Sequence, residues 1–414
     1  MKMAMTMSEK ILARAAGKAQ VVPGEIIQPD PELVIIHDGY VNMAYKQLSD
    51  IGYRKITKPE KVMIITDHKS LHLTPEAIMG AKNHRHVAEQ WGVKHFFGAG
   101  QAGHGHIYPM EAGLVRPGMF LFSYDMHCTN FGAVGAYAQR GGPDIITVLA
   151  TGSLLMSVPP TVRIELAGQF KPGVHPRDLG FWLCSQLAPD RLGIDFDYRV
   201  IEFAGPVIES MPLSSRVALC NTLTEIGVAN VMFPPRPGKG AERAVFSDDD
   251  AAFEHRIVLD IGKISPQVAL PGSPDRGVPV DEVAGVKIDH AFIGACGSGM
   301  YDDFELAAKL LKGRHVASHV RLFVVPGTVA IGKQMADDGL SNIFADAGAI
   351  QLPAGCGLCA GGLGGPLASG EVSISTAATN GAGRMGAKDA QCYLGSPITV
   401  ALSAINGCIT DPRS

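Results

Sequence analysis

The sequence lacks a long apolar run, and this absence narrows what the protein does. No stretch approaches the roughly 18 uncharged apolar residues that a membrane-spanning helix needs, so we expect no membrane span. Residues 1–18 contain no uninterrupted apolar core of signal-peptide length, and the apolar spacing after Ser8 instead predicts a capped amphipathic helix. We therefore expect a cytoplasmic protein.

Clustered charge is also missing. The chain carries 36 lysine and arginine residues against 40 acidic ones, a formal net charge of −4, and the basic residues are scattered. This distribution excludes the basic patch typical of nucleic-acid binding. With 46% apolar and 18% charged residues over 414 positions, the chain can build a large core in two or three domains. No internal repeat is present.

Short β-rich runs alternate with helical patterns along the chain. We expect strands within residues 61–68, 118–125, 145–152, 162–168, 198–205, 289–299, 319–327 and 341–350. Because several of these apolar runs end at Asp, Gly or Cys, they predict parallel α/β sheets that are buried on both faces. In such sheets ligands bind at the carboxyl ends of the strands.

A polar, proline-bearing region at residues 234–288 suggests a break between domains. We expect three α/β domains, at residues 1–160, 161–285 and 286–414.

Eight cysteines without a sign of secretion indicate reduced thiols or metal ligands rather than a disulfide framework. Cys356 and Cys359 lie in the glycine-rich stretch LPAGCGLCAGG, and Cys296 follows a predicted strand in IGACGSG. The residues alone leave three readings open: a [4Fe–4S] cluster with one iron open to substrate, a zinc site, or unrelated core cysteines. We expect the following to be small buried hydrophobes: Cys184, Cys220, Cys392 and Cys408.

Histidines and carboxylates gather at other predicted strand ends and on glycine-rich loops. TDHKSLH places Asp67 beside His68, and SYDMHC places Asp125 near His127. QAGHGHIYP adds His104 and His106. A neighbouring carboxylate can orient an imidazole and raise its pKa, which suits a general acid.

Taken together, these segments resemble the aconitase superfamily, and within it the large subunits of 3-isopropylmalate dehydratase. The likeness runs in order along nearly the whole chain, through MSEKILARAAG, PEKVMIITDH, GHIYPMEAGLVRPG, ALCNTLTEIGVANVMFPP, IGACGSGMYDDFELAAKLLKGRHVA, LPAGCGLC and SPITVALSAINGCITDP. The resemblance implies an aconitase-like fold of three α/β/α domains around a cluster-bearing cleft. It also implies a [4Fe–4S] cluster with one iron not ligated by protein.

The resemblance further implies roles for single residues. The cluster ligands would be Cys296, Cys356 and Cys359, and Asp67 with His68 would protonate the departing hydroxyl. Polar residues around the substrate would be His106, Asp125, His127, Asn221 and Glu225. Arg384 would hold a substrate carboxylate through a bidentate bond.

Three departures from the family pattern bear on the substrate. Met126 stands at the second position of the family's D-S-H-T motif, where the family has serine. The family's C-T-N motif reads Cys296–Gly297–Ser298 in this chain. The N-R of the arginine segment is replaced by Ala378 and Thr379, which removes one guanidinium fork. We expect Met126, Ser298 and Thr379 to contact a substrate whose side group is smaller or less charged than in the usual reaction.

These observations predict the large catalytic subunit of a hydro-lyase, a dehydratase, hydratase or isomerase of a substituted malate or related small hydroxy-carboxylic acid. A separate small subunit with a swivelling domain would carry the base that removes the α-proton. One alternative is a genuine 3-isopropylmalate dehydratase of leucine biosynthesis. Another is a non-catalytic binding protein that keeps the fold with zinc or no metal.

Overall fold

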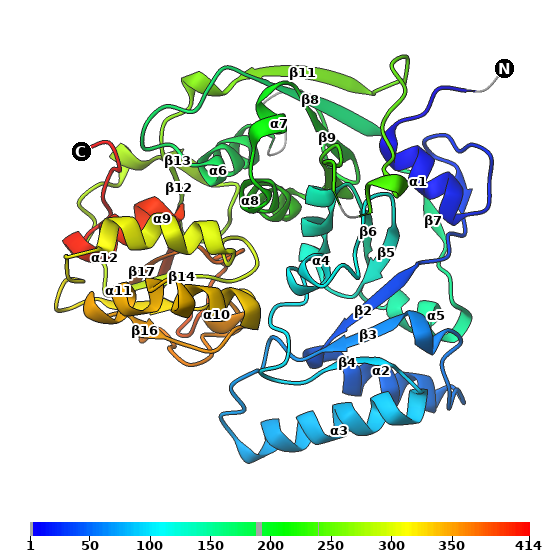
Figure 1. Cartoon of the computed structure of the whole chain (residues 1–414), viewed down its shortest axis with the longest axis horizontal. Coiled ribbons are helices and arrows are strands. Elements are labelled where there is room, and N and C mark those ends of the chain that lie inside the picture. The colour runs from blue at the N-terminus through cyan, green and yellow to red at the C-terminus, as the bar shows by residue number, and fades with distance from the viewer. Residues whose placement is uncertain (1–2, 188–192, 239) are drawn as a thin grey trace.

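The computed structural model describes residues 3–187, 193–238 and 240–414, and it consists of α/β layers built on three large sheets (Figure 1). The predicted α/β class is confirmed. None of the helices in these ranges combines the length and the hydrophobicity that crossing a bilayer requires.

The first sheet has five parallel strands, which run in the order β4 (His95–Phe97), β3 (Val62–Ile65), β2 (Leu33–His37), β5 (Phe120–Ser123) and β6 (Tyr137–Arg140). Its central strands are continuous apolar runs, and all five residues of β2 are buried. The helices of this part of the chain are α1 (Met7–Ala15), α2 (Asp38–Asp50), α3 (Pro75–Trp91), α4 (Tyr108–Glu111) and α5 (Asp144–Thr151). A small antiparallel pair joins β1 (Ile26–Ile27) to β7 (Met156–Ser157).

The second sheet has four parallel strands, in the order β10 (Asn230–Met232), β9 (Val200–Ala204), β8 (Thr161–Ala167) and β11 (His255–Asp260). Its helices are α6 (Pro176–Leu187), α7 (Val207–Ser210) and α8 (Leu213–Leu223). Helices α6 and α8 pack closely on each other beneath the strands β8, β9 and β11, as Figure 1 shows in green.

The third sheet has seven strands, in the order β13 (Gly277–Pro279), β12 (Gln267–Ala269), β18 (Gln391–Leu394), β17 (Val372–Ser375), β14 (His290–Ile293), β15 (Arg321–Val324) and β16 (Ile350–Gln351). The strands from β18 to β16 are parallel, whereas β12 is antiparallel to both of its neighbours. The helices are α9 (Tyr301–Leu311), α10 (Val329–Asp337), α11 (Leu340–Asp346) and α12 (Pro397–Asn406). The three-domain division stays a prediction, and its boundary at residue 285 would fall between two strands of this sheet.

Short 3-10 segments complete the described chain: η1 (Pro59–Lys61), η2 (Met126–Val134), η3 (Thr224–Ile226), η4 (Ala241–Arg243), η5 (Ile261–Lys263), η6 (Val280–Glu282) and η7 (Gly357–Cys359). The predicted amphipathic helix near the N-terminus is confirmed as α1, although the side chain of Thr6, not Ser8, accepts the capping bond from the backbone of Glu9.

Two predicted strands are wrong. Residues 145–152 lie almost entirely in helix α5, and residues 341–350 lie largely in helix α11 and the turn after it. Both runs are short and apolar, and a short apolar run does not distinguish a buried strand from a helix.

The first and third sheets meet through a few direct backbone contacts. The backbone N–H of His104 donates to the carbonyl of Gly327 (2.7 Å), and Gly103 pairs with Thr328 in an isolated bridge. The Thr328 hydroxyl donates to a carboxylate oxygen of Glu111 (2.6 Å). These contacts hold the strand ends of the first sheet against those of the third, where the candidate site lies.

Candidate active site

A histidine–aspartate network occupies the carboxyl ends of β2 and β3. The two strands are parallel neighbours, so the ends of both meet at one edge of the sheet. His37 donates from Nδ1 to Oδ2 of Asp67 (2.9 Å), and His68 donates from Nδ1 to Oδ1 of the same carboxylate (2.7 Å). The backbone N–H of Gly105 adds a third bond to Asp67 (2.7 Å). Asp67 is fully buried. The three donors hold its carboxylate in place, and the carboxylate in turn orients both imidazoles.

A second acidic group follows the neighbouring strand β5. Asp125 caps the 3-10 segment η2 by accepting a bond from the backbone N–H of His127 (3.1 Å). His127 donates from Nε2 to Glu225 (2.7 Å), which η3 carries. The carboxylate of Asp125 also lies 3.7 Å from Nε2 of His68 and 3.7 Å from Nε2 of His106. This carboxylate therefore connects the predicted acid pair to the other predicted polar residues.

The charges in these networks follow from their partners. Burial alone would raise the pKa of Asp67, but the charges of His37 and His68 outweigh it and hold that pKa well below its usual range. Burial would lower the pKa of His68, yet the charge of Asp67 and the bonds to Asp125 and Asp67 raise it well above normal. The pKa of His127 is raised to about 9, because hydrogen bonds to Asp125 and Glu225 outweigh its burial. His68 and His127 are therefore cations at neutral pH.

Two further histidines lie in the same network and behave in the opposite way. Burial lowers the pKa of His104 to about 3 and holds the pKa of His106 well below its usual value. Both ring nitrogens of His106 and Nε2 of His104 are buried without a hydrogen-bond partner among the described residues. These neutral imidazoles are free to accept a bond from, or donate one to, a bound reactant.

The three predicted cysteines lie together in one buried apolar cluster. Cys296 follows β14. Cys356 directly precedes the segment η7, which comes after β16, and Cys359 is the last residue of that segment. Each of the three cysteines is at most 2% exposed. Asn221 of α8 donates from Nδ2 to the sulfur of Cys296 (3.2 Å). Arg384 approaches the sulfur of Cys359 with Nη2 at 3.8 Å. A hydrogen bond from the thiol of Cys356 and the guanidinium of Arg384 lower the pKa of Cys359 well below its usual value, against its burial.

The cysteine loop lies directly on the histidine–aspartate network. The backbone N–H of Cys356 donates to the carbonyl of Asp67 (2.9 Å). Gly355 has a φ of 150°, and a Cβ at that position would lie 2.7 Å from the same carbonyl oxygen. Only glycine permits this approach without a shift of backbone. The thiols and the acid pair are therefore held in one site by main-chain contact.

The donor set fits an iron–sulfur group better than other metals. Three cysteine sulfurs are the ligands that such clusters take from proteins. The amide oxygen of Asn221, whose nitrogen contacts Cys296, is buried and has no partner among the described residues. His104, His106 and Cys296 also offer ligand atoms within 4.8 Å of one another, and so do His37, Asp67 and His68. The first of these sets shows where a zinc ion could compete.

The remaining predicted residues are Ser298, Met126 and Thr379. Ser298 is fully buried and accepts a bond from Nη1 of Arg177 (3.4 Å). Met126 begins η2 and Thr379 lies on the loop between β17 and β18, and both are half-buried. A cavity of about 510 Å³ opens beside this site and is lined by His68, His84 and Ala360 among others. It runs between helices α2 and α3 and the chain that follows Cys359.

Sequence reasoning missed three residues of the site. His37 ends the apolar run LVIIH, and the rule that found Asp67 at a strand end would have found it too. Asn130 donates to the backbone carbonyl of Cys296 (2.9 Å), and Arg177 reaches the segment that follows this cysteine. Nothing in the local sequence around Asn130 or Arg177 signals these long-range contacts.

The chain matches the model of the aconitase family (aconitate hydratase) over residues 9–239 and 238–407. It is 37% identical to the 3-isopropylmalate dehydratase large subunit 1 of Methanopyrus kandleri, over 99% of each chain. It is also 37% identical to the probable methanogen homoaconitase large subunit of Methanothermobacter thermautotrophicus, over 99% of this chain and 98% of the relative. Aconitase X of Thermococcus kodakaraensis, a solved structure, shares 12% identity with a TM-score of 0.49 over 85% of this chain and 84% of that chain.

Proposed function

Since this chain belongs to the aconitase family, we propose that it is the large catalytic subunit of a [4Fe–4S]-dependent hydro-lyase that acts on a small hydroxy-carboxylic acid. The hydro-lyase class follows from the family and from the names of the dehydratase and homoaconitase relatives. The family also implies an iron–sulfur cluster. The substrate class, the cluster type and the roles of single residues belong to the proposal.

Cys296, Cys356 and Cys359 would hold the cluster through their sulfurs. When bound with one iron free of protein ligands, such a cluster supplies a Lewis acid that polarises the carbon–hydroxyl bond of a hydroxy acid. Arg384 supports this assignment, because its guanidinium faces Cys359 and provides positive charge beside the sulfurs. The same side chain is the expected fork for one substrate carboxylate.

His68 would protonate the departing hydroxyl. Its Nδ1 is engaged with Asp67, so the proton available for transfer is carried on Nε2, which faces Asp125. The raised pKa of His68 keeps that proton in place at neutral pH, as a general acid requires. Asp67 does not give up a proton itself, but its bonds to His37 and His68 hold the imidazole in position.

A partner chain would complete the reaction. Relatives that align with this chain over nearly its full length are named as large subunits. We expect a small subunit with a swivelling domain to supply the base that removes the α-proton of the substrate.

One observation carries this proposal. The backbone hydrogen bond from Cys356 to Asp67 joins the two halves of the site, which are the buried thiols and the His37–Asp67–His68 network. The test is purification of the chain without oxygen together with its small subunit, followed by iron and sulfide analysis and a hydration assay. The assay uses a series of methyl-, dimethyl- and isopropyl-substituted malates and their dehydrated acids. Turnover of at least one of them with an intact cluster is expected.

Two other results would redirect the assignment. Turnover that is fastest with isopropylmalate would favour a genuine 3-isopropylmalate dehydratase, which the names of several relatives support. One equivalent of zinc without sulfide, and no turnover of any acid in the series, would instead favour a non-catalytic protein. The cytoplasmic location stays a prediction from the sequence.

A further inference from the structure

Arg177 is a fully buried cation that lacks an anionic partner within the described part of the chain. It lies in the first turn of α6 with an exposed fraction of 0%. Its Nη2 donates to the carbonyl of Ala377 (2.6 Å), and its Nη1 donates to the Ser298 hydroxyl over a long 3.4 Å. Its Nε is buried without a hydrogen-bond partner among the described residues. No described carboxylate oxygen lies within 4.0 Å of a guanidinium nitrogen, the distance that defines an ion pair. Arginine stays charged even when buried.

This placement costs free energy in two ways. An uncompensated charge in the interior is strongly unfavourable, and the first turn of a helix is the positive end of its dipole, which disfavours a cation. The guanidinium lies 5.2 Å from the ring centroid of Phe181, which offsets only part of this cost. The described part of the chain therefore holds a buried positive charge with which none of its carboxylates forms an ion pair.

Two acids lie in the vicinity without forming an ion pair with Arg177. Asp178 accepts a bond from the backbone N–H of His175 (2.7 Å), and Asp303 accepts one from that of Met300 (3.0 Å). Burial raises the pKa of both carboxyls to about 7, so each is only partly ionised at neutral pH. Neither of them pairs directly with the guanidinium.

Two of the residues beside the guanidinium, Gly297 and Asn221, also lie next to Cys296. A Cβ on Gly297, the residue after Cys296, would lie 2.2 Å from Nη1 of Arg177. Glycine at this position thus leaves the space that the guanidinium occupies. The same Cβ would lie 2.5 Å from Oδ1 of Asn221, whose amide nitrogen contacts the sulfur of Cys296. Arg177 therefore reaches from α6 to the immediate surroundings of a predicted cluster ligand.

We propose that Arg177 offsets the negative charge of the iron–sulfur cluster that Cys296, Cys356 and Cys359 hold, and so acts as a positioning residue for the cluster. This inference rests on the proposed function. A cluster with three thiolate ligands carries net negative charge, which is the charge that the buried guanidinium lacks. Because Arg177 is fully buried and its contacts lie beside Cys296, the proposal assigns it to the cluster.

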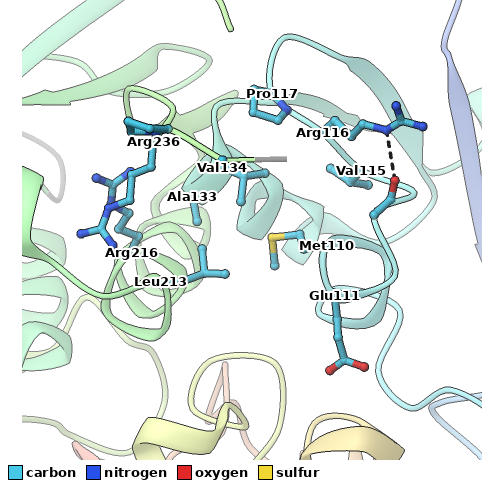
Figure 2. A pocket seen from close by; sticks show the side chains of 13 residues that line it. Met110, Glu111, Val115, Arg116, Pro117, Ala133, Val134, Leu213, Arg216 and Arg236 are labelled. Atoms are coloured by element: carbon cyan, nitrogen blue, oxygen red, sulfur yellow. Dashed lines mark hydrogen bonds between the residues drawn. The ribbon is translucent and has the colours of Figure 1, made fainter. Parts of the chain in front are cut away.

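Arg216 provides a matched control. It is 3% exposed, lies on α8, and donates to the carbonyls of Pro234 (2.9 Å) and Ile208 (2.7 Å). Its guanidinium lies 5.3 Å from the ring centroid of Phe233, and its Nε is also without a partner. Arg216 lines a separate cavity of about 380 Å³ whose lining includes none of the predicted site residues (Figure 2). It is thus a buried arginine whose cavity is lined by none of the three predicted cluster cysteines.

The test compares the unchanged protein with Arg177→Met, Arg177→Lys and Arg216→Met, each loaded with iron and sulfide without oxygen. The measurements are the midpoint potential of the cluster, the rate at which a chelator removes iron, and the melting temperatures with and without the cluster. We expect Arg177→Met to make the potential more negative and iron loss about tenfold faster. The increase in melting temperature on loading should shrink in Arg177→Met and persist in Arg177→Lys. Arg216→Met should lower both melting temperatures equally and leave the potential unchanged.

Two results would overturn the proposal. One is an Arg177→Met protein whose potential and rate of iron loss match those of the unchanged protein. The other is an equal loss of stability with and without the cluster, including failure to fold in both states, which would make Arg177 a structural tie between α6 and the third sheet. If the unchanged protein takes up no iron and sulfide, the proposed function fails as well. If it loads normally, a negative result concerns Arg177 alone.

Discussion

The histidine half of the site, which follows strands β2, β3 and β5, and the thiol half, which follows β14 and β16, balance their charges differently. In the histidine half each charged imidazole faces a carboxylate, as His68 faces Asp67 and His127 faces Glu225. In the thiol half Arg384 approaches the sulfur of Cys359, and Arg177 bonds to Ser298, two residues after Cys296. No described carboxylate forms an ion pair with either cation. The charges of the histidine half are therefore paired among the described residues, whereas the proposed negatively charged cluster would balance the cations of the thiol half.

Of the changes that distinguish the two halves, removal of one predicted cluster ligand should have the largest effect. We expect Cys356→Ala to lose the cluster, and all turnover with it, while the histidine half stays folded. Cys392→Ala is the control, because Cys392 is buried in the same apolar cluster but lies on β18. Iron and sulfide analysis, with circular dichroism of both variants, checks this expectation. A full complement of iron in Cys356→Ala would exclude this cysteine as a ligand.

Loss of the general acid should instead damage the chemistry and spare the cluster. We expect His68→Gln to lower kcat by about 10²–10⁴-fold, the range for a positioned proton donor, with the iron content unchanged. His84→Gln is the control, since His84 lines the same cavity and is nearly buried. It should leave kcat close to that of the unchanged protein. An effect of His68→Gln on KM alone would assign His68 to binding and not to proton transfer.

The pH dependence of stability should also separate the halves. The folded pKa of His127 is about 9, above the value of about 6.5 for an unperturbed histidine. A raised folded pKa stabilises the native state fully below the unfolded pKa, and this contribution disappears as the pH rises through the folded pKa. The free energy of unfolding of the cluster-free protein should therefore fall by about 3 kcal/mol between about pH 6.5 and 9 on account of His127.

Urea unfolding at several pH values measures this slope, and His127→Gln should remove the part that His127 contributes. His290→Gln is the matched control. His290 is buried and bonded to Ser373, but burial lowers its pKa to about 3, so it stays neutral across this range. The slope above pH 6.5 should be the same in His290→Gln and in the unchanged protein. A slope that survives in His127→Gln undiminished would mean that its ion pair with Glu225 does not stabilise the fold.

The sequence indicates where several residues of the histidine half lie, because parallel strands bring their ends to one edge. Asp67 and Asp125 each follow an apolar strand, and the parallel pairing of β3 and β5 with β2 places them in one network. The same rule finds Cys296 after β14. Apolar runs alone were less reliable, since residues 145–152 and 341–350 proved to be mainly helical.

The balance of charge in the thiol half could not be predicted. Arg177 donates to the carbonyl of Ala377, 200 positions further along the chain. A contact at that separation depends on how α6 packs against the third sheet, and no local pattern encodes it. The need for glycine at position 297 is likewise visible only when the guanidinium of Arg177 is seen beside it.

The last prediction concerns the backbone contact between the two halves. Gly355→Ala would place a Cβ 2.7 Å from the backbone oxygen of Asp67, which cannot move without disturbing the acid pair.

Gly361→Ala is the control, because Gly361 has a φ of 72° but nothing within 4 Å of its Cβ position. Gly361→Ala should cost only the strain of a left-handed residue, about 1–2 kcal/mol, and leave kcat unchanged. Gly355→Ala should add about 1–3 kcal/mol from the clash and also lower kcat, since it shifts Asp67 against the cysteine loop. Equal losses of stability and unchanged kcat in both variants, by urea unfolding and steady-state assay, would show that the two halves work without this contact.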